Sequence, residues 1–303
     1  MKILVCGGAG FIGSHIVEHF HNDADVIVYD SLRTGFVENI TNFNVDFIED
    51  DIRNRDAVRK AMKGVDYVFL LSALVSVPES MKNSSECVDI NAKGTLIVLE
   101  EAARAGVKKL CLSSTSAIYG DNPVFPKVET MMPEPKSPYA VTKLDGEFYC
   151  NIFTQEKKLN TACMRYFNVF GPRQDPKSAY AAAIPIFTAN AVKNKPISVF
   201  GDGEQTRDFV YVKDVVAANL FLSQNDSSGV FNVGYGRQTT VNSLIEKILK
   251  LTNSNSIIEY LPERAGDVKH SVASIDKLLS NDFELNDRFD EGLKVTVDYF
   301  KNK

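Results

Sequence analysis

A run of glycines near the start of the chain restricts its fold more than any other feature. Residues 7–13 read GGAGFIG and directly follow the apolar run Ile3–Cys6, so the segment fits GxxGxxG between a strand and a helix. Glycine permits the tight turn and lets backbone N–H groups approach a pyrophosphate, while the helix N-terminus adds partial positive charge. A glycine turn packed for its own sake is the alternative, so a second signal is needed.

The residue that ends the second apolar run supplies that signal. Val26–Tyr29 is followed by Asp30, 20 residues after Gly10, where a carboxylate accepts ribose hydroxyls in dinucleotide sites. An acid at this place favours NAD over NADP, because a 2′-phosphate would lie beside a like charge. Arg33, three residues further on, is the contrary signal. The sequence therefore predicts NAD as the cofactor.

Apolar runs and amphipathic stretches alternate through the first half of the chain. This alternation predicts an α/β fold with a Rossmann-type, doubly wound parallel sheet and a smaller C-terminal substrate-binding domain. The pattern loosens after Arg165, and residues 167–180 read as a long loop. The predicted strands, each expected to be buried on both faces, are Ile3–Cys6, Val26–Tyr29, Val45–Ile48, Tyr67–Leu71, Lys109–Ser113 and Thr161–Arg165, and the predicted helices are Gly13–His21, Arg55–Met62, Asp89–Ala105, Pro138–Lys157, Ile184–Lys193, Asp214–Leu222 and Ser243–Leu251.

Composition excludes several classes of protein. The net charge is −5 and no block of Lys and Arg occurs, so nucleic acid is not expected as a partner. The longest apolar run, Tyr67–Val77, has eleven residues, whereas a bilayer span needs about 20. The apolar run before the glycines is too short for a signal peptide, and the five cysteines have no paired spacing. We therefore expect a cytoplasmic protein with reduced thiols, without a membrane segment.

Tyr139 and Lys143 form the most suggestive pair for catalysis. They stand four residues apart after Pro138, which suits the first turn of a helix, so both side chains lie on one helix face. An ammonium beside a phenol favours the phenolate and pulls a pKa of about 10 towards neutrality. Such a phenolate can take a proton from a sugar hydroxyl while hydride leaves the same carbon. A solvated Tyr/Lys face is the alternative interpretation.

A second group of hydroxyls ends the predicted strand Lys109–Ser113. Residues 113–120 read SSTSAIYG, and the carboxyl ends of parallel strands are where such folds bind ligands. One of these hydroxyls could share the substrate proton with Tyr139. The alternative interpretation, which holds for most of these hydroxyls, is a Ser/Thr-rich turn without a role in catalysis.

These motifs together resemble the extended short-chain dehydrogenases/reductases that act on nucleotide sugars. The resemblance runs nearly end to end, and within the family the chain is most similar to the UDP-glucose and UDP-N-acetylglucosamine 4-epimerases. It rests on GGAGFIGSH, Asp30, Asp51-Ile52, SVPES at 76–80, Asn91 with Gly94-Thr95, SSTSAIYG, YxxxK, RYFNVFGPRQDP at 165–176, VFGDGEQTRDFVYVKD at 199–214, FNVGYGRQTTV at 231–241 and RAGD at 264–267.

The resemblance implies a role for individual residues and for each part of the chain. It places the NAD-binding domain over 1–166, with a return near 206–228, and the nucleotide-sugar domain mainly over 167–303. Two of the residues below also have a purely structural interpretation. Arg207 is alternatively explained by a surface ion pair with Asp208, and Asn168 by a place in a turn. The implied catalytic residues are Thr115, Tyr139 and Lys143; the implied cofactor-binding residues are Gly7, Gly10, Phe11, Ile12, Gly13, Asp30, Asp51, Ile52, Leu71, Ala73, Asn91, Tyr139, Lys143 and Tyr166; and the implied substrate-binding residues are Thr115, Tyr139, Asn168, Phe200, Arg207, Arg264, Asp267 and Ser271.

Two neighbours of Thr115 indicate the reaction. Dehydratases of the family carry Asp and Glu at these places, and decarboxylases keep the Glu, but this chain has Ser116 and Ala117. Without those carboxyl groups the resemblance implies reversible oxidation at C4, and hence a UDP-hexose 4-epimerase that works through a transient 4-keto sugar. Ser271, at the family's gate position, is small and implies that N-acetylated UDP-sugars are accepted as well as UDP-Glc and UDP-Gal. The alternatives are a dehydratase or other NAD-linked nucleotide-sugar oxidoreductase, and a silent NAD-binding protein on the same fold.

Two further expectations concern metals and assembly. His15 and His19 are four residues apart, but no third ligand has matching spacing, so no metal site is expected. The apolar faces of Asp89–Ala105 and Pro138–Lys157 are mostly core, and the resemblance implies that these helices also pair across a homodimer.

Overall fold

The computed structural model describes residues 1–176, 182–263 and 269–303, which form two compact units. The first unit comprises Met1–Ile118, Pro135–Arg165 and Val216–Phe231. The second comprises Tyr119–Glu134, Tyr166–Val215 and Asn232–Lys303. No helix within the described ranges has the length and apolar character needed to cross a membrane.

The first unit is built on a seven-stranded sheet with the order β3-β2-β1-β4-β5-β6-β11. The pairs β1–β2, β2–β3, β1–β4 and β4–β5 are parallel, so these strands end at the same edge of the sheet. Chain order reverses direction between β1 and β4, the place where α/β sheets of this kind bind ligands. The strands are β1 (Lys2–Cys6), β2 (Asp25–Asp30), β3 (Asp46–Glu49), β4 (Tyr67–Leu70), β5 (Lys109–Thr115), β6 (Asn160–Tyr166) and β11 (Gly229–Val233).

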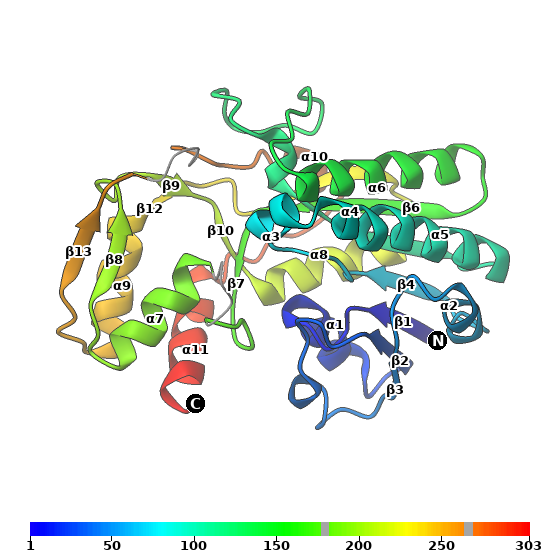
Figure 1. Cartoon of the computed structure of the whole chain (residues 1–303), viewed down its shortest axis with the longest axis horizontal. Helices are drawn as coiled ribbons and strands as arrows, with labels where there is room; N and C mark the ends of the chain where they lie inside the picture. The colour runs from blue at the N-terminus through cyan, green and yellow to red at the C-terminus, as the bar shows by residue number, and fades with distance from the viewer. Residues whose placement is uncertain (177–181, 264–268) are drawn as a thin grey trace. The chain divides into compact units, whose positions relative to one another are not determined.

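Helices cover both faces of this sheet, as the alternation in the sequence predicts (Figure 1). Side chains of successive strand residues point to opposite faces. Phe69 therefore packs on Phe20 of α1, whereas Leu70 joins the core under α2, α5 and α6. The helices of this unit are α1 (Phe11–Phe20), α2 (Arg55–Ala61), α3 (Val77–Lys82), α4 (Ser84–Cys87), α5 (Gly94–Ala105), α6 (Pro138–Gln155) and the part of α8 (Val212–Gln224) from Val216 onwards, with short 3-10 turns η1 (Val37–Asn39) and η3 (Ser116–Tyr119) and the π-helical turn η2 (Val88–Lys93).

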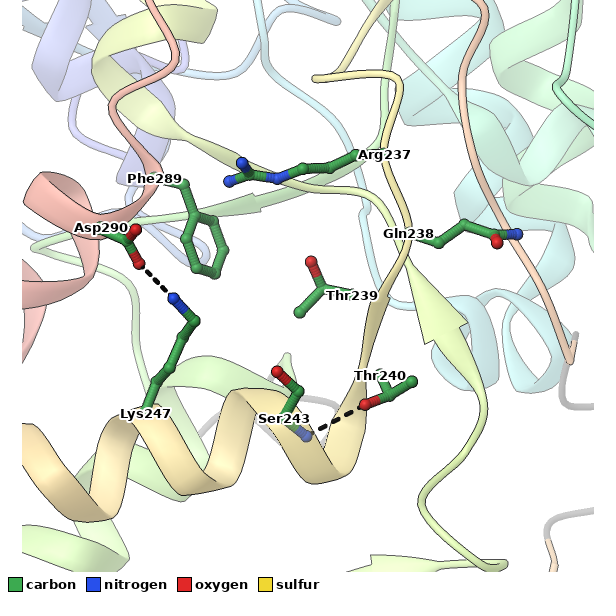
Figure 2. Close-up of a pocket in the computed structure, with 8 residues that line it drawn as sticks. All are labelled: Arg237, Gln238, Thr239, Thr240, Ser243, Lys247, Phe289 and Asp290. Carbon is green, nitrogen blue, oxygen red and sulfur yellow. Dashed lines mark hydrogen bonds and ion pairs between the residues drawn. The ribbon is translucent and has the colours of Figure 1, made fainter.

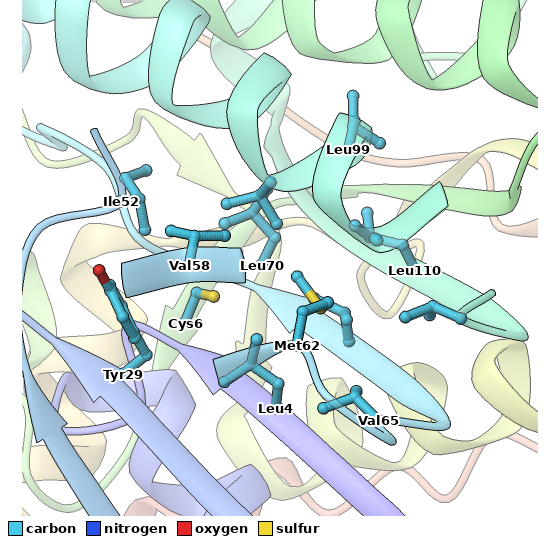
Figure 3. Close-up of a cluster of buried hydrophobic side chains, with 14 of the residues drawn as sticks. Leu4, Cys6, Tyr29, Ile52, Val58, Met62, Val65, Leu70, Leu99 and Leu110 are labelled. Atoms are coloured by element: carbon cyan, nitrogen blue, oxygen red, sulfur yellow. The ribbon is translucent and has the colours of Figure 1, made fainter. Parts of the chain in front are cut away.

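The main core of the first unit lies between the sheet and the helices α2, α5 and α6 (Figure 3). Leu4, Leu70, Leu99 and Leu110 are almost completely buried there. One expectation about burial is wrong: three of the four residues of β3 are exposed. The reason is its place at the edge of the sheet, where β2 is the only strand of the described residues that pairs with it. An apolar run alone does not distinguish an edge strand from a central one.

The second unit contains three two-stranded sheets and four helices among the residues that are described. The predicted loop over 167–180 is wrong at its start, because β7 pairs in parallel with β10. β8 pairs in parallel with β13, and β9 pairs antiparallel with β12. The elements are β7 (Asn168–Phe170), α7 (Ala183–Val192), β8 (Ile197–Phe200), β9 (Thr206–Arg207), β10 (Phe209–Tyr211), β12 (Thr239–Thr240), α9 (Val241–Thr252), β13 (Ile258–Leu261), α10 (Asp276–Leu279) and α11 (Phe289–Lys301).

A buried carboxylate joins three segments of the second unit. Asp208 is completely buried and accepts hydrogen bonds from the backbone N–H groups of Tyr235 (2.8 Å), Gly236 (3.0 Å) and Ala273 (3.1 Å). Gly234 is needed beside it, since a Cβ there would lie 2.7 Å from an Asp208 carboxylate oxygen. Burial raises the pKa of Asp208 to about 6, although the three N–H groups oppose the shift.

This raised pKa predicts how stability depends on pH. The folded pKa lies above the ordinary value of 3.8, so the contribution of Asp208 is fully present below about pH 4 and is lost as the pH rises through about 6. Between pH 7 and 4.5 the wild type should gain about 2 kcal/mol of unfolding free energy relative to Asp208→Asn. Urea unfolding of both proteins at the two pH values measures this difference. An equal difference at both pH values would contradict the prediction.

Candidate active site

At Gly7 and Gly13, the turn from β1 into α1 has no room for a side chain. A Cβ on Gly13 would lie 2.1 Å from the carbonyl oxygen of Gly7, and a Cβ on Gly7 would lie 2.7 Å from the backbone nitrogen of Ser72. Gly7 also adopts a φ of +84°, which favours glycine. Gly10 is the N-cap of α1, and Phe11 and Ile12 begin the helix half-buried. The loop therefore presents backbone at a helix N-terminus, and this geometry fits a pyrophosphate.

Asp30 ties this loop to the end of β2. Its carboxylate is 7% exposed and accepts hydrogen bonds from the N–H groups of Ala9 (3.0 Å) and Leu32 (2.9 Å). Burial raises the pKa of Asp30, and these two bonds oppose that shift. Each carboxylate oxygen keeps a further lone pair, so the group can still accept ribose hydroxyls. The residues present thus fit the pyrophosphate and ribose of a dinucleotide.

Four other predicted cofactor residues follow the ends of β3 and β4. Asp51 holds Arg53 through both carboxylate oxygens, and its carbonyl accepts the Tyr29 hydroxyl. Ile52 is buried. After β4, the N–H of Leu71 donates to the carbonyl of Cys6, and Ala73 follows half-buried. These positions lie at the same edge of the sheet as the glycine loop.

The two remaining cofactor predictions occupy buried places. Asn91 lies in η2 and is 2% exposed, with its amide oxygen accepting the N–H of Leu74 and its NH₂ donating to Leu74 O and Thr142 Oγ1. Its amide therefore holds the segment after β4 in place. Tyr166 is buried at the last position of β6.

Helix α6 places the predicted catalytic residues. Ser137 caps its N-terminus by accepting the N–H of Ala140, and Pro138 occupies the first turn, as the sequence predicts. The Tyr139 N–H is held by Ser80 Oγ at 3.2 Å. The Thr115 hydroxyl is close enough to the Tyr139 phenol to influence its pKa, and Lys143 Nζ donates to the carbonyl of Ser113 at 2.8 Å. The structure therefore brings together Thr115 at the end of β5 with Tyr139 and Lys143.

The expected effect of Lys143 on the phenol is wrong for this structure. Burial raises the pKa of Tyr139, and the neighbouring Thr115 hydroxyl only partly opposes this shift. The ammonium of Lys143 instead bonds a carbonyl, and burial lowers its own pKa to about 8. The predicted helical spacing of Tyr139 and Lys143 is correct, but spacing alone does not show how burial shifts the pKa of each group.

Sequence reasoning missed a buried ion pair next to these residues. Glu147, four residues after Lys143 on α6, binds Arg165 of β6 through both oxygens, at 2.9 Å to Nε and 2.7 Å to a terminal nitrogen. Ser114 Oγ donates to the same carboxylate at 2.5 Å. All three side chains are buried, and Ser114 directly precedes Thr115. The pair thus fixes α6 against the ends of β5 and β6. The only signal in the sequence was a charge that continues the Tyr139–Lys143 face.

The predicted substrate residues that the structure describes belong to the second unit, apart from Thr115 and Tyr139. Asn168 begins β7, and Phe200 ends β8. Arg207 donates to the carbonyls of Thr206 and Lys269, while Asp208 faces backbone N–H groups. Ser271 N–H donates to Thr206 O, so Arg207 and Ser271 share one neighbour. Arg264 and Asp267 lie outside the described residues.

A separate hollow of about 320 Å³ lies in the second unit and contains none of the predicted residues (Figure 2). Both cationic side chains that line the hollow form ion pairs: Arg237 binds Asp287 at 2.6 Å, and Lys247 binds Asp290 at 2.6 Å. Phe289 lies under both cations. We assign no role to this hollow. The lining residues are Arg237, Gln238, Thr239, Thr240, Ser243, Lys247, Phe289 and Asp290.

Comparison with known proteins agrees with this arrangement. Residues 3–234 match the family described as "NAD dependent epimerase/dehydratase family". UDP-N-acetylglucosamine 4-epimerase from Methanobrevibacter ruminantium, solved with UDP-N-acetylmuramic acid, is 40% identical with a TM-score of 0.96, over 99% of this chain and 98% of that one. UDP-glucose 4-epimerase from Thermotoga maritima, solved with UDP-glucose, is 42% identical with a TM-score of 0.95, over 100% and 99%. UDP-glucose 4-epimerase from Thermus thermophilus, solved with NAD, is 36% identical with a TM-score of 0.91, over 99% of both chains.

The buried ion pair yields a prediction about stability. Glu147→Gln leaves the Arg165 charge buried without its carboxylate, and we expect a loss of about 3–5 kcal/mol of unfolding free energy. Chemical denaturation measures the loss. Glu100→Gln is the control, because the Arg55–Glu100 pair is about 40% exposed and should cost less than about 1 kcal/mol. Equal effects of the two substitutions would show that the buried pair does not hold α6.

Proposed function

Because the chain belongs to the NAD-dependent epimerase/dehydratase family, we propose that it is a UDP-hexose 4-epimerase that uses NAD. Its substrates are UDP-Glc and UDP-Gal, and also UDP-GlcNAc and UDP-GalNAc. The observation that carries this proposal is that Thr115 at the end of β5 lies close to Tyr139, with Lys143 one turn further along the same helix. These groups stand at the carboxyl edge of the sheet that also carries the glycine loop.

The residues of the first unit supply proton transfer at one carbon of the sugar. NAD, held by the glycine loop and Asp30, would supply a reversible hydride acceptor for C4, which inversion at that carbon requires. Tyr139 takes the proton of the C4 hydroxyl as the carbonyl forms and gives it back when the alcohol is restored. The Thr115 hydroxyl, which lies close to the phenol, shares that proton. Lys143, whose ammonium donates to the carbonyl of Ser113, completes this group one turn further along α6.

Elimination and decarboxylation are less well supported than epimerisation. Ser116 and Ala117 directly follow Thr115 in η3, and neither carries a carboxyl group. A dehydratase of this kind needs acid and base groups at C6 and C5 of the sugar. Together with NAD, the three groups described above suffice for oxidation and reduction at C4.

We assign the nucleotide sugar to residues of the second unit. Two arginines, Arg207 and Arg264, suit a diphosphate, Asp267 can accept ribose hydroxyls, and Phe200 can pack beside uracil. Asn168 and the small Ser271 complete this proposed set. The division of labour that we propose is therefore NAD over 1–166, with a return near 206–228, and the nucleotide sugar mainly over 167–303.

We also propose a cytoplasmic homodimer. Val141, Phe148 and Ile152 lie seven and four residues apart on α6, so they share one face, and they are 44%, 56% and 50% exposed. A stripe of large apolar side chains on a helix otherwise packed on the core marks an interaction surface, and a second copy of α6 would match its chemistry. The five buried thiols support a reducing compartment.

A single substitution tests the proposed reaction. Tyr139→Phe removes the proton acceptor, and we expect kcat to fall by about 10³-fold with NAD still bound. Wild type, incubated without reductant with UDP-Glc or UDP-GlcNAc, should give the C4 epimer of each by NMR. Tyr260→Phe, which alters an exposed tyrosine of β13, should keep full activity. Unchanged turnover in Tyr139→Phe would exclude the proposed base.

A matched pair of isoleucines tests the dimer. Ile152→Glu puts a charge on the proposed interface of α6, and we expect light scattering to give the mass of a monomer. Ile257→Glu changes an isoleucine of the second unit that is 62% exposed, and the dimer mass should remain. A wild-type protein with the mass of a monomer would refute the interface.

A further inference from the structure

The contrary signal in the cofactor site, Arg33, is held by two acids. Its guanidinium donates to Glu86 at 2.6 and 3.0 Å and to Glu79 at 2.8 Å. Glu79 lies on α3 and Glu86 on α4, both in the segment that follows β4. Arg33 itself lies three residues after Asp30, at the end of β2. The ion pairs therefore draw the guanidinium towards α3 and α4.

The surroundings of this cluster are negative. The pKa of Asp51 is lowered mainly by its hydrogen bonds from Arg53 and further by the charge of Arg33, and Arg33 lowers the pKa of Glu86, so Arg33 is close enough to both acids to interact. Asp51 is in turn bound by Arg53. Counting Asp30, Asp51, Glu79 and Glu86 against Arg33 and Arg53 gives four negative and two positive charges, a net charge of −2. The described residues at the predicted ribose end thus offer a 2′-phosphate no excess of positive charge.

We propose that Glu79 and Glu86 determine the choice of NAD over NADP by withholding Arg33 from a 2′-phosphate. The inference rests on the proposed function, because it takes the glycine loop and Asp30 as the cofactor site. In dinucleotide sites that accept NADP, an arginine near the end of the second strand binds the 2′-phosphate. Here the arginine at that place is already paired with two acids, so its guanidinium is not available to a phosphate.

The side chains of this cluster are partly exposed, so the two acids can be replaced to test their effect on nucleotide choice. Arg33 is 35% exposed, and Glu79 and Glu86 are 36% and 37% exposed. Ion pairs at such positions contribute little to stability, so replacing the acids should not unfold the protein. Glutamine keeps an acceptor and the side-chain length but removes the charge. Without the two charges, the guanidinium is free to bind a phosphate dianion.

Competition between the two nucleotides tests the proposal without an activity assay. Wild type and the Glu79→Gln/Glu86→Gln double variant are equilibrated with equal concentrations of NAD and NADP. Bound nucleotides are then extracted from the isolated protein and quantified by mass spectrometry. We expect the bound NADP-to-NAD ratio of the double variant to exceed that of wild type by about 10-fold, or about 1.4 kcal/mol.

Two further variants make the result specific. Adding Arg33→Ala to the double variant should return the ratio to the wild-type value, because the gain requires the released guanidinium. Glu100→Gln, which removes the acid of the Arg55 pair on another part of the unit, should leave the ratio unchanged. A ratio that does not rise in the double variant, or a rise that persists without Arg33, would overturn the proposal. Wild type that binds neither nucleotide would instead contradict the proposed function.

Discussion

The buried ion pair between Glu147 and Arg165 fixes the positions of the proposed catalytic residues in the first unit. It joins α6 to β6, and through Ser114 it also joins α6 to the residue before Thr115. A charge pair in such surroundings is expensive to form and costly to break, because either partner alone would remain buried and uncompensated. Its effect is that one helix face, with Tyr139, Lys143 and Glu147 at intervals of four, lies in a single position against the strand that ends at Thr115.

The proposed cofactor site depends instead on positions that lack a side chain. Gly7 and Gly13 approach neighbouring backbone so closely that a methyl group would collide with it. Asp30 then stabilises the loop by accepting the Ala9 N–H, so the group that is proposed to bind ribose also shapes the turn. Burial sets the protonation of groups at both ends, since desolvation raises the pKa of Asp30 and of Tyr139 alike. Backbone N–H groups oppose this shift at Asp30, and the Thr115 hydroxyl opposes it at Tyr139.

Local features could be predicted from the sequence because their causes are local. The glycine loop, the start of α6 at Pro138 and the shared face of Tyr139 and Lys143 follow from backbone freedom, capping and helical period. Features that depend on tertiary neighbours could not be predicted. The exposure of β3 follows from its place at the sheet edge, and the strand β7 from its pairing with β10. The raised pKa of Tyr139 and the partner of Glu147 likewise depend on burial and on residues distant in the chain.

The central claim is that oxidation and reduction take place at one sugar carbon, with the same hydrogen leaving and returning. UDP-glucose carrying deuterium at C4 tests this most directly, in ordinary water without added reductant. We predict that NMR will find UDP-galactose with the deuterium still at C4. Product that carries solvent hydrogen at C4 would contradict the account, because the carbon would then have exchanged its hydrogen with water.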